Sequence, residues 1–232
     1  MLATDAVSAA ATWRPQLFGD KRGPTIPDSI IEPLWTGPRI LAFVRDDVPM
    51  LTDADGYTID DRPEIEAALV AAAGGSTVLL EAVLTPEPIQ AQVGIGGRDL
   101  VSAPDPGKAM TQMLVGSRGD RKDRVARHVD EAQRRQMPPA TEPLALVAVD
   151  LIWLDDESLC DVPLLERKRI LESVITESEL IRVGIHVKPP IDAWLGSWRA
   201  FGFRRLAFKA ANSRYVPGAK NQDWALAEIP QR

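Results

Sequence analysis

Residues 144–154 read LALVAVDLIWL, and residues 164–178 read LLERKRILESVITES. The first stretch is a continuous apolar run with one carboxylate, Asp150, inside it, which is typical of a strand that is covered on both faces. In the second, apolar residues recur at helical spacing, which predicts an amphipathic helix. The acidic residues 155–157 between the two stretches predict a turn. A buried strand followed by a helix is therefore the starting point for the fold.

The elements on either side mix hairpins with helices. Asp46 and Asp47 predict the turn of a hairpin, and Gly74 and Gly75 predict the end of a helix that begins near Pro63. These flanking elements are a hairpin of 39–45 with 48–51, a helix over 64–73, strands over 77–84 and 181–187, a helix over 192–201 and a hairpin over 206–229. This order favours an α+β fold of antiparallel sheets flanked by helices over a regularly alternating parallel sheet.

Two regions stand apart from this pattern. Residues 1–29 are expected to form an extended lead-in with little regular structure, because each proline fixes φ and removes a donor. Residues 94–143 are rich in Gly, Pro and charge, and are expected to form an insertion with a helix over 121–135. The predicted domain thus spans 30–232 and contains a charged insertion.

Composition describes an ordinary soluble protein. The chain has 232 residues, 45% of them apolar and 26% charged, with a net charge of −6. The single cysteine, Cys160, cannot form an internal disulfide, and the N-terminus has no basic segment before an apolar stretch. The longest apolar stretches are much shorter than the roughly 18 residues of a membrane span. A cytoplasmic protein without a membrane segment is therefore expected.

Several familiar signatures fail when their spacing is checked. The acidic residues from Asp53 to Glu64 imitate a calcium loop, but Thr58 stands where the loop needs glycine. The glycines at 94–97 lack the third glycine of a dinucleotide fingerprint. The two histidines, His128 and His186, have no partner at zinc-ligand spacing. Calcium, dinucleotide and zinc sites are therefore not predicted.

Positive charge is concentrated near the C-terminus. Residues 193–222 contain six basic and no acidic side chains, interleaved with aromatic residues, and residues 118–135 carry a net charge of +3. Such a mixture suits phosphate contacts combined with base stacking. The alternative is that the aromatic residues belong to the core and the basic residues form a solvated rim. The sequence supports the two interpretations about equally.

Four pieces of the chain, read in order, resemble the nucleotidyltransferase (adenylation) domain of ATP-dependent DNA ligases. The pieces are EPLWTGPR at 32–39, VLLEA at 78–82, VAVDLIWLDD with PLLERKRILE at 147–156 and 163–172, and LAFKAANSRYVPG at 206–218 with Trp224 beyond. They are similar to the family's K-x-D-G-x-R, D-G-E, F-D-x-L and S-x-Y-x-P-G motifs. The resemblance implies the ATP-grasp-like α+β fold of that family. It also implies ATP and Mg²⁺ as cofactors and DNA as the partner.

The departures from the family pattern bear on mechanism. The motif lysine, the nucleophile that attacks the α-phosphate of ATP, is Leu34 here, and the motif aspartate is Thr36. A hydrocarbon side chain has no lone pair, so no catalytic residue is assigned. Further replaced positions are Val149 at the adenine-stacking aromatic, Arg204 at the metal-supporting glutamate, and Leu226 and Glu228 at the two final lysines. Lysyl-AMP is therefore not expected at this site.

The residues that match the family motifs define the predicted site. The resemblance assigns nucleotide or phosphate binding to Arg39, Glu81, Lys209 and Lys220. It assigns nucleic-acid contacts to Arg204, Arg205, Arg214 and Tyr215, and a metal ion to Glu81 and Asp150. No oligonucleotide-binding (OB-fold) domain is expected in the chain.

Three functions remain open at this stage. The first is a degenerate DNA ligase-like protein that binds a nucleotide or a nucleic-acid end without forming lysyl-AMP. The second is a working ligase in DNA repair or recombination that uses a displaced lysine, or a protein partner that supplies activated AMP or missing domains. The third is an interaction scaffold without a ligand, in which the tryptophans are core and interface anchors.

Overall fold

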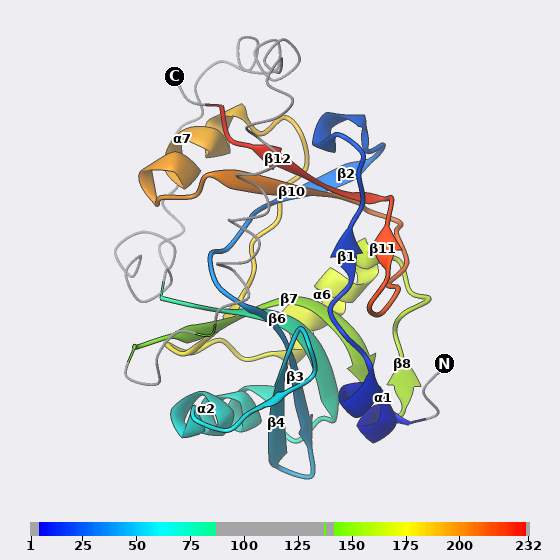
Figure 1. Cartoon of the computed structure of the whole chain (residues 1–232), viewed down its shortest axis with the longest axis vertical. Helices are drawn as coiled ribbons and strands as arrows, with labels where there is room; N and C mark the ends of the chain where they lie inside the picture. The colour runs from blue at the N-terminus through cyan, green and yellow to red at the C-terminus, as the bar shows by residue number, and fades with distance from the viewer. Residues whose placement is uncertain (1–4, 87–136, 138–141, 231–232) are drawn as a thin grey trace.

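Two β-sheets form the framework of the protein, which the computed structural model describes over residues 5–86, 137 and 142–230 (Figure 1). The strands are β1 (Leu17–Phe18), β2 (Ser29–Pro33), β3 (Arg39–Arg45), β4 (Val48–Asp53), β5 (Thr58–Ile59), β6 (Val78–Thr85), β7 (Ala145–Leu154), β8 (Glu157–Ser158), β9 (Ile181–Val183), β10 (Arg205–Ala210), β11 (Lys220–Asn221) and β12 (Trp224–Glu228). The large sheet has the order β5-β4-β3-β6-β7-β8, with β9 parallel beside β7. The small sheet has the antiparallel order β12-β10-β2, and β1 pairs with β11.

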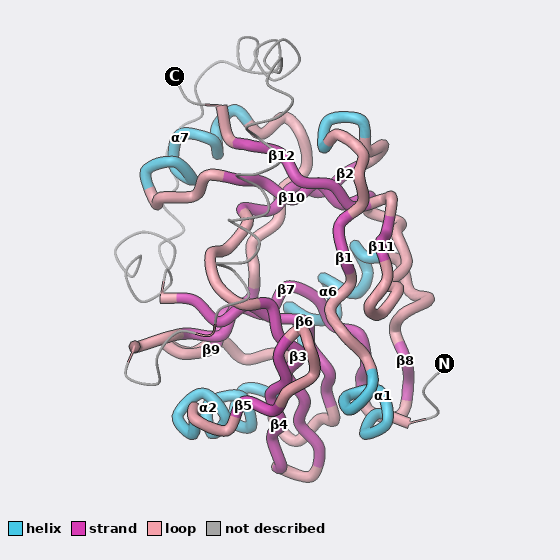
Figure 2. Tube along the Cα trace, in the orientation of Figure 1, coloured by secondary structure: helices cyan, strands magenta, loops and turns pink. Residues whose placement is uncertain are grey.

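The helices surround these sheets (Figure 2). They are α1 (Ala6–Thr12), the 3-10 turn η1 (Gly23–Thr25), α2 (Pro63–Ala73), α6 (Leu164–Val174) and α7 (Asp192–Ala200). Helix α6 packs on β7, while its first backbone N–H groups donate to the carbonyls of Ser213 and Ala211, just after β10. This helix therefore connects the two sheets. Among the described helices, none has the length and apolar character that crossing a bilayer requires.

The central strands β6 and β7 are buried along almost their whole length. One face packs against α2 and α6, in a core that includes Leu69, Leu80 and Leu171. The other face is covered by the small sheet with α7 and by α1. Because both faces are covered, the strands carry continuous apolar runs. This confirms the predicted buried strand around Asp150 and the α+β class.

Most predicted elements are present, with shifted ends. The 39–51 hairpin, the helix after Pro63 and the helix over 192–201 are confirmed as β3–β4, α2 and α7. Helix α6 ends at Val174 instead of residue 178, because Ile175 is extended and the Thr176 N–H donates to the Ala72 carbonyl. The predicted strand over 181–187 is regular only to Val183. The insertion at 94–143, its helix over 121–135 and the basic stretch 118–135 lie outside the described residues, apart from Met137 and 142–143.

The lead-in contains more structure than the sequence indicated. Asp5 caps helix α1 by accepting a hydrogen bond from the Ser8 backbone N–H at 2.8 Å. Ala6, Ala9 and Ala10 are buried against β3 and β6. A seven-residue helix is marginal by itself, so tertiary packing rather than local propensity determines this element. The expectation of little regular structure in 1–29 therefore fails at α1.

A glycine fixes the entry into β3. Gly37 has φ +134°, and a Cβ there would lie 2.0 Å from the Leu84 carbonyl oxygen of β6. Only glycine accommodates this backbone approach. The Pro38 carbonyl then accepts a hydrogen bond from the Leu84 N–H at 3.1 Å. The glycine of the 32–39 motif thus has a backbone role, and it places Arg39 at the start of β3.

Candidate functional site

A small cavity lies between the two sheets, and both sheets contribute to its wall. Strand β2 and the turn after it supply Glu32 and Leu34, and β10 supplies Lys209. The large sheet supplies Arg39 from β3 and Glu81 from β6. The free volume is about 20 Å³, whereas pockets for drug-sized ligands measure about 300–1,000 Å³. As the side chains stand, the cavity has room for about one water molecule.

Apolar side chains cover the rest of the cavity wall. They are Phe18, Pro33, Trp35, Val83, Val149 and Ala207. Leu34, at the position of the family's nucleophilic lysine, is one of the residues that line the cavity, and its backbone N–H donates to the Arg205 carbonyl at 2.9 Å. The structure thus places position 34 in the cleft, where the sequence motif predicts it.

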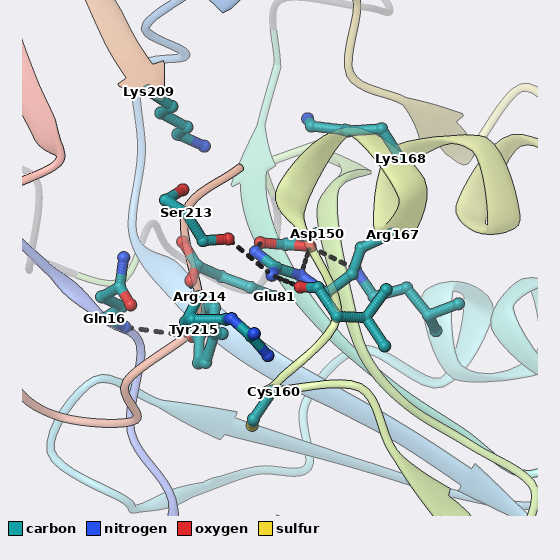
Figure 3. A network of polar contacts seen from close by, with 12 residues as sticks. Gln16, Glu81, Asp150, Cys160, Arg167, Lys168, Lys209, Ser213, Arg214 and Tyr215 are labelled. Atoms are coloured by element: carbon teal, nitrogen blue, oxygen red, sulfur yellow. Dashed lines mark hydrogen bonds and ion pairs between the residues drawn. The ribbon is translucent and has the colours of Figure 1, made fainter. Parts of the chain in front are cut away.

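One glutamate at the cavity joins two buried lysines. The Lys209 ammonium donates to Glu32 Oε2 at 2.8 Å, and the Lys168 ammonium of α6 forms an ion pair with Glu32 Oε1 at 2.6 Å. Lys168 and Lys209 point toward a common space from two different elements (Figure 3). We refer to Glu32, Lys168 and Lys209 as the lysine cluster. It contains one more positive than negative charge.

Charge and burial oppose each other in the lysine cluster. Burial favours the neutral acid and raises the pKa of Glu32, but the two ammonium groups outweigh this effect and hold that pKa at about 2. Burial also lowers the pKa of Lys209, although Glu32 opposes that shift. The Lys209 ammonium lies 4.2 Å from the centre of the Trp224 ring, which adds a cation–π contact. Glu32 is therefore ionised over the whole physiological pH range.

A second polar network lies on the large-sheet side of the cavity (Figure 3). The Arg39 guanidinium donates to Glu81 Oε1 at 2.5 Å, and the Tyr215 hydroxyl donates to Glu81 Oε2 at 2.6 Å. The Gln16 backbone N–H donates to the Tyr215 oxygen at 3.0 Å. Burial, followed by the Glu81 charge, raises the pKa of Tyr215 well above its ordinary value, so the phenol stays protonated. Both carboxylate oxygens of Glu81 are thereby engaged.

Asp150 and Arg167 form a fully buried, two-pronged ion pair. Arg167 Nε and Nη2 donate to the two Asp150 oxygens at 2.8 and 2.7 Å, and neither side chain is exposed. Arg167 also donates to the carbonyls of Val162 and Ser213. The pair therefore fastens β7 to α6 and to the loop after β10. Its geometry is typical of a structural link.

The metal role predicted for Glu81 and Asp150 stays a prediction. The two residues are register partners on β6 and β7. Each carboxylate, however, has a guanidinium partner, Arg39 for Glu81 and Arg167 for Asp150. Within the described parts of the chain, no group of three or more His, Cys, Asp or Glu side chains is arranged to hold a metal ion.

The structure separates the other predicted site residues from the cavity. Lys220 pairs with Asp20 at 2.9 Å and Arg214 lies 3.4 Å from Asp161, both at the surface. Arg204 is exposed, whereas Arg205 is nearly buried and lies 3.5 Å from Glu228. Tyr215 is buried, and its hydroxyl contacts Glu81. Of the predicted residues, Arg39, Glu81 and Lys209 therefore meet at the cavity.

Aromatic residues of the C-terminal third mostly belong to the core. Trp198, Phe203 and Phe208 are buried in the cluster between the small sheet and α7, and Phe201 is partly buried against it. For these side chains the core interpretation is confirmed. The nucleic-acid interpretation therefore depends on the basic side chains at the surface.

Sequence reasoning did not assign two residues that line the cavity, Phe18 and Glu32, or two that contact its lining, Gln16 and Lys168. The acidic residue inside the apolar run 30–32 was a usable signal, because a buried carboxylate needs a cationic partner. The identity of that partner was not readable, since Lys168 and Glu32 are brought together only by the tertiary fold.

The fold, with this cavity between its sheets, is that of the nucleotidyltransferase domain of ATP-dependent DNA ligases. Among solved structures, it is similar to the ligase domain of M. tuberculosis LigD, with a TM-score of 0.61 and 17% identity over 94% of this chain and 60% of that one. A mycobacterial DNA ligase D complexed with ATP and MES gives a TM-score of 0.60 and 18% identity, covering 92% of this chain and 59% of that one. At these identities the likeness concerns the fold.

Sequence comparison also finds DNA ligases, but the match covers a shorter part of the chain. The chain is 35% identical over 86 residues to a DNA ligase of Thermococcus fumicolans, and 32% identical over 88 residues to one of Methanothrix thermoacetophila. These matches cover 35% and 36% of this chain, and the chain spans 15% of each ligase. No family model matches the sequence. The predicted resemblance to DNA ligases is confirmed by both comparisons.

Proposed function

We propose that this protein is a DNA ligase-like domain that binds a nucleotide or a nucleic-acid end without forming lysyl-AMP. The observation that carries the proposal is Leu34, which lines the cavity and stands at the position of the family's nucleophile. Covalent adenylation needs an amine that attacks the α-phosphate. Leu34 supplies no lone pair, while Arg39, Glu81 and Lys209 still surround the same space.

The surviving polar groups suit binding better than group transfer. Lys209 and Arg39 offer fixed positive charge for phosphate oxygens. ATP is the ligand named for one of the structural neighbours, which supports ATP or AMP as the first ligand to test. The cavity must open to admit it, because its free volume is about 20 Å³.

Mg²⁺ fits the present arrangement poorly. Hard cations prefer several free oxygen ligands, and the oxygens of Glu81 and Asp150 are engaged by guanidinium and phenol groups. We therefore assign no metal-dependent step to these residues.

Intact mass after incubation with ATP and Mg²⁺ tests the absence of adenylation. We expect no gain of one nucleotide monophosphate, and no label retained from α-labelled ATP after denaturation. A Lys209→Ala variant is the matched control, since it removes a cleft amine. Covalent label at any lysine of the unmodified protein would overturn this part of the proposal.

Binding is tested separately from chemistry. A thermal-shift titration with ATP and AMP, and fluorescence anisotropy with a nicked duplex, should each show saturable binding. Affinity for the duplex should fall linearly with salt on logarithmic axes, because basic side chains displace counterions from phosphates. A protein that responds to neither nucleotide nor DNA would instead be an interaction scaffold.

A working ligase is the second candidate, and one observation favours it. Two lysine amines, Lys168 and Lys209, lie within ion-pair distance of Glu32, two residues before Leu34. If either amine replaced the motif lysine, the purified protein would seal a nicked duplex. Loss of sealing in Lys209→Ala, but not in the surface variant Lys188→Ala, would support this candidate. Roles in DNA repair or recombination depend on that result.

A further inference from the structure

The N-terminal segment runs from α1, beside the large sheet, through β1 to β2 of the small sheet (Figure 1). We infer that residues 16–18, here named the strap, close the nucleotide site and must be displaced before a nucleotide binds. This inference rests on the proposed function, because it describes how access to that same site is controlled. It is carried by the polar and aromatic contacts of the strap with residues of the cleft.

The backbone of Gln16 forms hydrogen bonds with two polar side chains beside the cavity. Its backbone carbonyl accepts a hydrogen bond from the Arg39 guanidinium, and its backbone N–H donates to the Tyr215 hydroxyl oxygen at 3.0 Å. Arg39 and Tyr215 are also the two partners of Glu81. The strap therefore forms hydrogen bonds with Arg39 and Tyr215, the groups that would otherwise face a phosphate or a ribose.

Phe18 occupies the apolar side of the same space. Its ring lines the cavity with Val149 and Ala207. The Arg39 guanidinium carbon lies 5.3 Å from the ring centre, and the Trp224 ring lies 5.8 Å away. Removing this side chain would join the small cavity to the space that the ring now fills. The strap thus explains why a cleft with ligase-type residues has so little free volume.

The strap has little support from a sheet. Strand β1 has two residues and pairs only with the two-residue β11, so its sheet contributes little cooperativity. Leu17 is 38% exposed. The Gln16 side-chain oxygen accepts from the Val216 N–H, but among the described residues the buried Gln16 amide nitrogen has no hydrogen-bond partner. An unsatisfied buried donor destabilises the closed arrangement and favours its release.

Hydrogen exchange with ATP tests the displacement in the unmodified full chain. The reporters are the amides of Leu17, Gly19 and Val216, which donate to Ala219, Trp224 and Gln16 when the strap is closed. We expect ATP to raise exchange at these amides about ten-fold while slowing exchange in β10. Slower or unchanged exchange at the strap, together with protection of β10, would overturn the strap and leave the proposed function standing.

Affinity provides the second readout. Phe18→Ala should bind ATP about ten-fold more tightly than the unmodified protein, because it increases the open population. Val48→Ala is the control, since Val48 lies outside the strap at the start of β4, is 65% exposed and should leave affinity unchanged. Phe18→Leu replaces Phe18→Ala where the latter does not fold.

The outcomes separate the strap from the proposed function. Binding by the Phe18 variant alone supports the strap, even where the unmodified protein shows no response to ATP. Equal ATP affinity in the unmodified protein and the Phe18 variant overturns only the inference that the strap closes the site. Absence of ATP binding in both proteins overturns the nucleotide proposal and the strap together.

Discussion

The two buried ion clusters of this protein differ in charge balance. Asp150 and Arg167 match one anion with one cation, and both Asp150 oxygens are satisfied. The lysine cluster has two cations for one anion, and the Lys168 ion pair lacks the alignment of a hydrogen bond. A balanced pair suits a permanent link between elements. An unbalanced cluster beside a cavity keeps residual attraction for an anion.

The location of the two clusters agrees with this difference. The Asp150–Arg167 pair lies at the junction of β7 and α6, away from the cavity lining. Glu32 and Lys209 line the cavity themselves. Stability experiments should therefore respond most strongly at the balanced pair, and ligand experiments at the lysine cluster.

Arg167→Met should have the largest effect on folding. It leaves Asp150 buried and unpaired, and breaking such a pair costs about 3–5 kcal/mol. Urea denaturation gives the change in the free energy of unfolding. Arg169→Met is the matched control on the same helix, because Arg169 is 63% exposed and pairs with Glu166 at the surface. A loss below about 1 kcal/mol at position 167 would contradict the structural assignment of the pair.

Glu32→Gln should change how the free energy of unfolding depends on pH. The pKa of Glu32 is about 2 in the folded protein against an ordinary value of 4.5. Its ionisation therefore stabilises the fold above about pH 4.5, and this contribution is lost as the pH falls toward 2. The difference in unfolding free energy between the unmodified protein and Glu32→Gln should shrink by roughly 3 kcal/mol over that window.

Urea denaturation at several pH values between 5 and 2 measures this difference for both proteins, and the subtraction removes the contribution of other carboxylates. A difference that stays constant with pH would mean that Glu32 is not held in its ionised form by the two lysines.

Lys168→Met should cost less than Arg167→Met. It leaves Glu32 and Lys209 as a matched pair, so no buried charge is orphaned, and we expect a loss of about 1–2 kcal/mol. The double variant with Glu32→Gln completes a mutant cycle that isolates the coupling between the two side chains. A loss as large as that of Arg167→Met would show that both clusters are equally structural.

The local parts of this fold were readable from the sequence. Pro63, the acidic first turn and Gly74 at φ +59° define α2 by themselves. The hairpin around Asp46 and Asp47 is equally local, since both residues adopt positive φ. Helix α1 was missed because its alanines become informative only once the sheet they pack on is known.

The residues of the site likewise divide into those that the sequence predicts and those that it does not. Arg39, Glu81 and Lys209 were predicted because each belongs to a motif of the ligase family, and the structure brings all three to the cavity. Phe18 lies outside the quoted motifs and Lys168 was assigned no role within its motif; the tertiary fold brings Phe18 to the cavity and Lys168 to Glu32. Motif reading therefore finds the inherited residues of a cleft and misses those that close it.

The smallest effect on folding is expected at the surface pair of Lys220 and Asp20. Both side chains are more than half exposed, so Lys220→Ala should change the free energy of unfolding by less than about 0.5 kcal/mol. If Lys220 contacts phosphate as the family resemblance implies, the same variant should weaken binding of a nicked duplex and reduce the magnitude of its salt slope by about one. Anisotropy titrations at several salt concentrations measure both quantities. An unchanged slope would remove Lys220 from the DNA-binding surface, while the cavity residues Arg39 and Lys209 would remain the phosphate contacts to examine.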